Sequence, residues 1–260
     1  MSTLSLSDDG RIARLTIEAG KGNVIGAAVI DELRGFIDQA ASAPELRALV
    51  ITGAGPHFSF GASVDEHLPG KVERMLPDFH ALVRALLRFP VPTVAAVRGQ
   101  CLGGGLEVAL ACVRIVAAPD AKLGQPEIRL AVFAPAATAL LPARVGQGRA
   151  DDLLLTGRTV TGEEAYRIGL VDELAVDSSG PIDPLARAEA WAREHLVPLS
   201  LLALGRAVRA SRAGYVKNIE ARLAELEKLY LDETTNCPDA VEGLYAFVER
   251  RAPSFRQAHG

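Results

Sequence analysis

The sequence predicts an α/β fold in which parallel strands alternate with helices. Short apolar runs typical of strands are separated by segments whose apolar residues recur at helical spacing. We expect strands at residues 12–17, 46–52, 93–98 and 113–117, with helices between them at 27–41 and 77–89. Strands joined by helices run parallel, and 260 residues are enough for one large domain with an appendage.

The first element is a β-hairpin. The apolar runs at residues 4–7 and 12–17 flank Asp9-Gly10, a pair of residues that favours a tight hairpin turn. The helix expected at 27–41 follows. Its apolar residues at helical spacing are Ile30, Leu33 and Ile37.

Prolines bracket the next helix. Pro77 suits the first turn of the helix expected at 77–89, because a backbone N–H would have no helical partner there. Pro90 and Pro92 end this helix, and the buried strand at 93–98 follows directly.

The segment from residue 100 to 129 carries the strongest chemical signal. Three glycines at 103–105 precede a short helix expected at 107–111, and such a start frees backbone N–H groups to face an anion or a carbonyl oxygen. Glu107 lies just after the glycines, and Glu127 ends a Gly-Gln-Pro-Glu motif. Two carboxyls at one centre can divide acid and base work. The spacing alone is equally compatible with a tight turn and two surface carboxylates.

The C-terminal part changes from mixed to helical. Helices are expected at 136–141 and 149–155, a capping box formed by Thr161 and Glu164 begins another, and a strand returns at 169–173. After a connector rich in Ser, Gly, Pro and Asp, the pattern is all-helical. The candidate helices there are residues 185–195, 199–211, 219–231 and 240–250.

Composition and charge argue against several classes of protein. Apolar residues make up 49% and charged residues 23% of the chain, and the formal net charge of −4 gives no electrostatic footprint for nucleic acid. No apolar run reaches the ~18 residues of a membrane span, and no leader pattern is visible, so we expect a cytoplasmic protein. Cys101, Cys112 and Cys237 are unpatterned, which predicts neither disulfides nor a metal site. The histidines are predicted to be surface or packing residues: His57, His67, His80, His195 and His259.

The glycine run and the two glutamates resemble the signature of the crotonase (enoyl-CoA hydratase/isomerase) superfamily. The resemblance extends over nearly the whole chain, including Gly169-Leu170-Val171 and the segment 242–251. It implies a crotonase-like core of repeated ββα turns over residues 1–195, with roughly perpendicular sheets. It also implies a C-terminal helical region at 196–260 that packs trimers together, giving a trimer or a hexamer built as a dimer of trimers.

The same resemblance implies a role for individual residues in binding and transforming an acyl-CoA thioester. Glu107 and Glu127 would be the catalytic acid and base, and the backbone N–H groups of Ala62 and Gly104 would form an oxyanion hole. The residues expected to contact CoA are Lys21, Phe60, Ala62, Val64, Phe247 and Arg250. No metal or redox cofactor is implied, because CoA arrives as part of the substrate.

Two departures from the family pattern bear on the acyl group. Ser63 stands where the oxyanion loop usually has aspartate, and the stretch after the second glutamate differs from the usual glycine-rich one. The predicted acyl pocket is formed by Phe133, Ala134 and Pro135. These departures resemble the cyclohexa-1,5-diene-1-carbonyl-CoA hydratases, in which water adds 1,4 across a cyclic diene. We expect a wider, shorter pocket that suits a flat ring.

Hydration of another enoyl-CoA by a general enoyl-CoA hydratase is the alternative to the cyclic diene, and three other functions are weighed against hydration. An enoyl-CoA isomerase of the same superfamily would share the oxyanion hole, but it can manage with one carboxylate, so the presence of both glutamates favours a hydratase. A non-catalytic acyl-CoA-binding or assembly protein would be expected to lack them. A serine hydrolase is disfavoured because the sequence has no Gly-x-Ser-x-Gly elbow.

Overall fold

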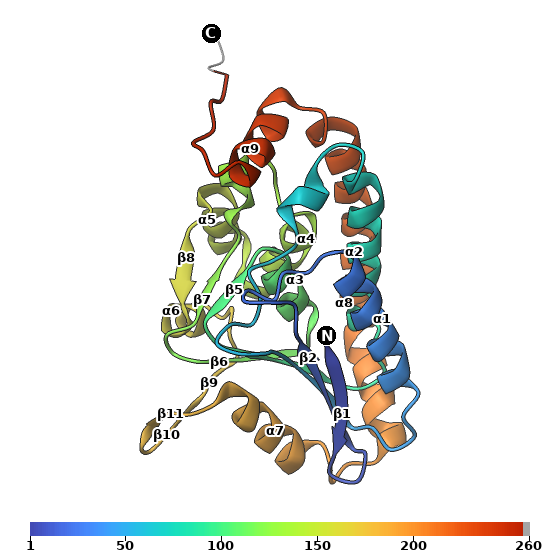
Figure 1. Ribbon diagram of the computed structural model, residues 1–260. Coiled ribbons are helices and arrows are strands. Elements are labelled where there is room, and N and C mark those ends of the chain that lie inside the picture. Colours follow the sequence, from blue (N-terminus) through green and yellow to red (C-terminus); the bar gives the residue numbers. More distant parts are fainter. Residues whose placement is uncertain (257–260) are drawn as a thin grey trace.

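The computed structural model describes residues 1–256, and these residues form a six-stranded sheet as the centre of the fold (Figure 1). The strands β1 and β2 form the predicted antiparallel hairpin, and all other neighbours in this sheet pair in parallel. In spatial order the strands are β1 (Thr3–Ser7), β2 (Ile12–Ile17), β3 (Ala48–Gly53), β4 (Thr93–Val97), β6 (Arg114–Ala117) and β9 (Glu173–Leu174).

A smaller sheet within the described range has three strands. Its members are β5 (Gln100–Leu102), β7 (Lys122–Gly124) and β8 (Thr159–Thr161). The chain passes from β4 to β5 and then into a helix, and from β6 to β7 and then into helices, which are the ββα turns that the sequence predicted. A two-stranded hairpin of β10 (Val176–Asp177) and β11 (Gly180–Pro181) lies in the predicted polar connector.

Helices cover both faces of the large sheet. The α-helices are α1 (Ala27–Ala41), α2 (Val72–Leu87), α3 (Gly104–Ala111), α4 (Pro135–Val145), α5 (Gln147–Thr156), α6 (Gly162–Arg167), α7 (Pro184–His195), α8 (Leu201–Leu229) and α9 (Pro238–Val248). Two short 3₁₀-helices, η1 (Val64–His67) and η2 (Pro126–Leu130), and a π-helix, η3 (Tyr230–Thr234), complete the set in the described chain.

The hydrophobic core has two parts because side chains alternate along each strand. Ala13, Leu15 and Ile17 of β2 face the main core, which is covered by α1, α2, α3 and α4. Ile12 and its neighbours on the other face pack on α7, which lies alone below the sheet in Figure 1. Burying each of these aliphatic side chains stabilises the fold by roughly 1.5–3 kcal/mol before entropy is counted.

The C-terminal helices bracket the centre of the molecule. The long helix α8 packs against α2 and α4, and α9 packs against the short helices η1 and η2. A β-carbon added at Gly243 of α9 would lie 2.2 Å from the carbonyl oxygen of Leu130, so α9 and η2 touch through their backbones. No helix in residues 1–256 has both the length and the apolar composition needed to cross a membrane.

Four predicted elements differ from the observed ones. The helix expected from Pro77 begins at Val72 and carries Pro77 inside it, because Val72, Met75 and Leu76 form a buried apolar stripe that the proline alone would not indicate. The helices expected at 199–211 and 219–231 are one helix, α8. Gly214, between the two predicted helices, costs only about 1 kcal/mol in the helix interior.

The predicted strand at 169–173 is mostly a turn, and only Glu173 and Leu174 pair with β6. Gly169 adopts a left-handed conformation with φ of +82°, which ends the preceding helix instead of starting a strand. The predicted N-cap of α6 is confirmed, since Thr161 Oγ1 accepts a hydrogen bond of 3.1 Å from the backbone N–H of Glu164. The other half of the predicted capping box is replaced, because the Glu164 carboxylate accepts a 2.9 Å hydrogen bond from Arg158. The predicted His259 and the last residues of the C-terminal region, 257–260, lie outside the described residues.

Candidate active site

The three consecutive glycines are required by close approach of the backbone to its neighbours. Gly103 has a φ of +50°, and a β-carbon there would lie 2.5 Å from Glu127 Oε1. A β-carbon at Gly104 would lie 2.9 Å from the backbone nitrogen of Ala62. The glycine run therefore lets the start of α3 approach both the loop that carries Ala62 and the second glutamate.

Two backbone N–H groups meet at this approach. Within residues 1–256, neither the Ala62 N–H nor the Gly104 N–H has a hydrogen-bond acceptor. Gly104 is the first residue of α3, where no intrahelical acceptor exists for its N–H. A pair of neighbouring donors without acceptors is the arrangement that can receive a developing oxyanion.

The loop that presents Ala62 is held rigidly. Ile25 donates a 2.9 Å backbone hydrogen bond to the carbonyl of Gly61, and Gly61 donates one of 3.0 Å to Ser59 Oγ. Ser59 Oγ in turn donates to the carbonyl of Asn23 at 2.7 Å. Since these bonds satisfy the groups on either side, the Ala62 donor keeps its direction without help from a ligand.

Glu107 is a buried carboxyl inside α3, with 5% of its surface exposed. Its Oε1 accepts a 2.7 Å hydrogen bond from the backbone N–H of Ala137, in the first turn of α4. Burial raises the pKa of Glu107 to about 7, although the N–H groups of Ala136 and Ala137 pull it the other way. The carboxyl is thus poised to change charge near neutral pH.

Glu127 projects from η2 toward the same region. Burial raises its pKa to about 8, and the nearby charge of Glu107 acts in the same direction. The side chain of the buried Gln125 lies beside it: with the amide nitrogen facing Glu127, Nε2 donates to Oε1 at 3.1 Å and to Oε2 at 3.0 Å. The two glutamates therefore form an interacting pair that resists carrying two negative charges.

A cavity of about 380 Å³ unites most of the residues that the sequence singled out. Both glutamates and both oxyanion residues line it. So do, besides Ala62, three more of the residues predicted to contact CoA (Phe60, Val64 and Phe247) and the three predicted for the acyl pocket (Phe133, Ala134 and Pro135). Phe60 and Phe247 are about half exposed, at 47% and 55%, and mark its mouth.

Two predicted residues lie outside this lining. Lys21 is exposed and does not line the cavity, although Gly22 next to it presses against the Phe60 ring. Arg250 follows the end of α9, is also exposed, and has a left-handed backbone with φ of +56°. Both therefore lie on the surface. Lys21 precedes Gly22, which packs on the Phe60 ring, and Arg250 lies three residues after Phe247.

Sequence reasoning missed three polar residues near the cavity: Gln125, His67 and Tyr230. His67 lines the cavity, and its Nδ1 donates to the carbonyl of Ser63 at 2.8 Å, which leaves Nε2 as an acceptor. Burial lowers the pKa of His67, so its ring is neutral at pH 7. The Tyr230 hydroxyl is buried without a partner in the described chain, and burial raises its pKa, with further contributions from the charges of Glu127 and Glu107.

Only weak sequence signals could have found these residues. Gln125 lies within the quoted Gly-Gln-Pro-Glu motif, and His67 lies three residues after the predicted Val64 contact. Tyr230 reaches the site from a π-helix more than 100 residues later in the chain, and π-helical turns are frequent at functional sites. Its position depends on packing that no local pattern records.

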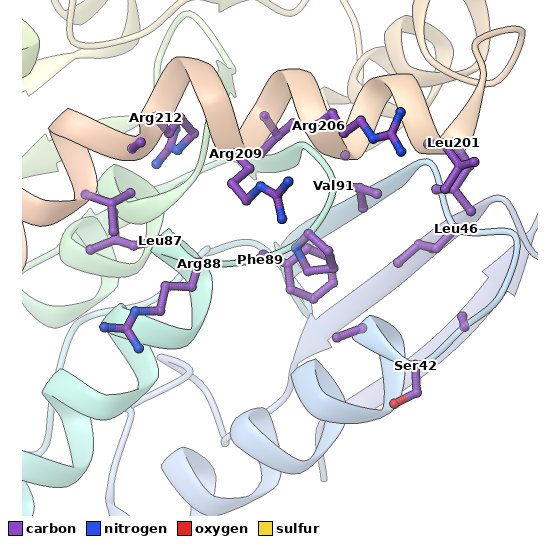
Figure 2. A pocket seen from close by; sticks show the side chains of 18 of the residues that line it. Ser42, Leu46, Leu87, Arg88, Phe89, Val91, Leu201, Arg206, Arg209 and Arg212 are labelled. Atoms are coloured by element: carbon purple, nitrogen blue, oxygen red, sulfur yellow. The ribbon is translucent and has the colours of Figure 1, made fainter.

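A larger cavity of about 990 Å³ lies elsewhere and contains neither glutamate (Figure 2). It runs along the first half of α8, where Arg206, Arg209 and Arg212 lie on one side, and Phe89 and Val91 lie opposite. Among the described residues that line it, Glu220 is the only carboxylate, so it holds no pair of carboxyls. Chemistry, not size, therefore distinguishes the candidate site.

Comparisons with known proteins identify the family of the chain and several relatives. A family model described as enoyl-CoA hydratase/isomerase matches residues 8–258. The chain is 51% identical over 250 residues to the cyclohexa-1,5-dienecarbonyl-CoA hydratase of Thauera aromatica, covering 96% of this chain and 95% of that protein. A probable enoyl-CoA hydratase of Bacillus subtilis is 35% identical, covering 98% and 99%. The crystal structure of an enoyl-CoA hydratase from Mycobacterium avium subsp. paratuberculosis superposes with a TM-score of 0.82 at 28% identity, covering 98% of each chain.

Proposed function

The chain belongs to the enoyl-CoA hydratase/isomerase family, and we propose that it hydrates cyclohexa-1,5-diene-1-carbonyl-CoA to 6-hydroxycyclohex-1-ene-1-carbonyl-CoA, a hydro-lyase step of benzoyl-CoA degradation. One observation carries the proposal: the buried Glu107 and the half-buried Glu127, both with raised pKa values, line one cavity beside two backbone N–H groups that lack acceptors in the described chain. The substrate assignment follows the relative from Thauera aromatica.

The oxyanion hole would activate the ring. The thioester carbonyl oxygen accepts hydrogen bonds from the N–H groups of Ala62 and Gly104, and these bonds strengthen as negative charge moves onto that oxygen. Each such donor is worth roughly 2.7–4 kcal/mol in the transition state. The conjugated ring becomes electron-poor at the β-carbon, which is where the water oxygen attacks.

The two glutamates would then handle the protons. Near neutral pH the pair holds one proton, because its members titrate near pH 7 and 8. The ionised carboxylate takes a proton from the bound water, whose hydroxyl bonds to the β-carbon. The protonated carboxyl delivers its proton to the far carbon of the diene, the double bond moves between them, and the carboxyls exchange roles.

The remaining parts of the substrate would be held at the cavity mouth. Phe60, Val64 and Phe247 contact the pantetheine and adenine parts of CoA, and Lys21 and Arg250 attract its phosphates. Arg250 stands where a lysine is usual in the family, which keeps the charge and changes the geometry of the contact. The exposed positions of Lys21 and Arg250 support a role at the surface end of the substrate.

Assembly would involve the C-terminal region. Residues 196–260 form an oligomerisation region attached to the core at 1–195, and the active protein is a cytoplasmic trimer or a hexamer of two trimers. Exposed apolar side chains on the C-terminal helices support this proposal, since such surface is usually covered by a partner. They include Leu202, Tyr245 and Val248.

A mass-spectrometric assay would test the function. The purified protein is offered cyclohexa-1,5-diene-1-carbonyl-CoA and, separately, crotonyl-CoA. A gain of one water by the cyclic diene establishes the reaction. Hydration of crotonyl-CoA alone keeps the mechanism and discards the cyclic substrate. Rearrangement without a change in mass identifies an isomerase, and tight binding without any reaction identifies an acyl-CoA-binding protein.

A further inference from the structure

A second cavity adjoins the active site behind Glu127. It measures about 590 Å³ and lies between η2, α4, α5 and α8. Among the described residues, three line both this cavity and the active-site cavity: Glu127, Phe133 and Ala134. The two spaces are therefore separated by a thin wall, and the wall includes a carboxyl of the proposed acid–base pair.

The second cavity has the character of a tunnel for an alkyl chain. Leucines in its lining extend from the interior to the surface: Leu226 is 7% exposed, Leu229 41% and Leu155 70%. Polar groups gather at its outer part, among them the exposed Arg222. An apolar passage with a polar exit would accommodate a hydrocarbon tail longer than a six-membered ring.

Phe133 is the bulky part of the wall. Of the three shared residues, Ala134 is small and Glu127 belongs to the proposed acid–base pair. The aromatic ring of Phe133 therefore provides most of the barrier between the two cavities. The ring packs against Tyr230 with centroids 5.3 Å apart, and Tyr230 is only 1% exposed. Because this support is buried, the ring cannot swing away from the wall without displacing the core.

We propose that Phe133 determines acyl-group specificity by closing the passage from the active site into the second cavity. A ring attached to the thioester carbonyl ends before the wall, whereas a long straight acyl chain would run into the Phe133 ring. This inference rests on the proposed hydratase function. It assigns the second cavity to straight-chain acyl groups, which the wild-type protein excludes.

The test compares the wild type with Phe133→Ala on three esters: the cyclic dienoyl-CoA, crotonyl-CoA and dodec-2-enoyl-CoA. The variant joins the two cavities, so its kcat/KM for dodec-2-enoyl-CoA should rise by about tenfold or more, while that for crotonyl-CoA changes little. The cyclic diene should react more slowly, because the ring loses a wall that positions it. Phe133→Leu should give an intermediate gain.

A second substitution tests whether the long acyl chain enters the second cavity. Leu155→Trp narrows the second cavity from its exposed side and should leave wild-type hydration of the cyclic diene unchanged. Combined with Phe133→Ala, it should abolish the gain on dodec-2-enoyl-CoA. Thermal unfolding of each variant verifies that it is folded.

The outcomes separate the two proposals. If the wild type hydrates none of the three esters, the proposed function fails and the specificity role fails with it. If the wild type hydrates a short or cyclic ester, and folded Phe133→Ala and Phe133→Leu gain nothing on dodec-2-enoyl-CoA, only the role of Phe133 is overturned. A gain that survives Leu155→Trp would overturn it as well, because the chain would then take another path.

Discussion

The active site and the contact between α2 and α8 both remove a carboxyl from water, and they do so in opposite ways. Glu107 and Glu127 have no cationic partner in the described chain, and burial raises their pKa values. Glu227 of α8 accepts a 2.5 Å hydrogen bond from Nδ1 of the fully buried His80, and Arg84 lies 3.6 Å away. These contacts lower the pKa of Glu227, the bond from His80 contributing most.

The difference teaches how one residue type serves two purposes. A carboxyl with partners is fixed in its charged form and fastens two helices together. A carboxyl that is removed from water near another carboxyl has a raised pKa and tends to keep its proton. Ionising it in the folded protein lowers stability, and its raised pKa suits it for proton transfer near neutral pH. The charge state of a carboxyl, and not its burial alone, therefore distinguishes the candidate active site from the contact between α2 and α8. The following variants test that contrast.

The largest effect is expected from removing either member of the glutamate pair. Glu107→Gln and Glu127→Gln keep shape and hydrogen bonding but cannot exchange a proton, so each should lower kcat for hydration by about 10²–10⁴-fold. Product formation measured by mass spectrometry checks this. Near-wild-type turnover by either variant would remove that residue from the proposed acid–base pair.

Disrupting the oxyanion hole should cause the next largest loss of kcat. In Gly104→Ala the added carbon would crowd the Ala62 nitrogen, so the variant should lose about 10²–10³-fold in kcat. Gly35→Ala is the matched control, because Gly35 lies inside α1 with open space around it and should gain about 0.5–1 kcal/mol of stability. Equal activity losses in the two variants would contradict the proposed hole.

The pH dependence of kcat should be bell-shaped. Below about pH 7 both carboxyls are protonated and no base remains, whereas above about pH 8 both are ionised and no acid remains. The rate should therefore be highest between these values and fall about tenfold per pH unit well outside them. A rate that stays flat from pH 5 to pH 9 would contradict the raised pKa values.

The stability of Glu107→Gln should exceed that of the wild type at alkaline pH. In the unfolded chain the carboxyl ionises near the ordinary glutamate value of 4.5, and in the fold its pKa is about 7. The wild type therefore loses stability as the pH rises between these values, and the neutral variant does not. Urea unfolding should show similar stabilities at pH 4 and an advantage on the order of 3 kcal/mol for the variant at pH 8.

Glu227→Gln should change the stability of the protein in the opposite direction to Glu107→Gln and by a smaller amount. The folded-state pKa of Glu227 is lowered, so its contribution is present above the unfolded value and disappears as the pH falls through the folded one. The variant should be about 1 kcal/mol less stable than the wild type at pH 7, and the difference should vanish in acid. An identical pH dependence for Glu107→Gln and Glu227→Gln would erase the contrast between the two regions.

The sequence predicted what short-range rules determine. The hairpin around Asp9-Gly10 and the helix at 27–41 follow from turn chemistry and spacing, and both were confirmed. The glycine run at 103–105 indicated that the backbone there closely approaches another group. The site roles of Glu107 and Glu127 came from the family resemblance, and the fold brings both carboxyls to one cavity.

Long-range packing determines the rest. Tyr230, His67 and Phe133 come from three distant segments, and only the folded chain places them together. The same limit explains α8, because the tertiary contacts of Tyr215 and Val216 with the core carry the helix through Gly214. The wall between the two cavities could not be foreseen either, since it depends on a volume that four separate helices, η2, α4, α5 and α8, enclose.

The contact of α9 with η1 and η2 has a consequence for how the protein is made. A ribosome synthesises both glutamates in the first half of the chain, yet the cavity also needs Phe247, and Phe133 needs the support of Tyr230. Domains fold as units during synthesis, beginning from the N-terminal side. A nascent chain thus carries its proposed catalytic groups long before it can use them. Activity therefore requires that α9 has been synthesised and has docked on η1 and η2.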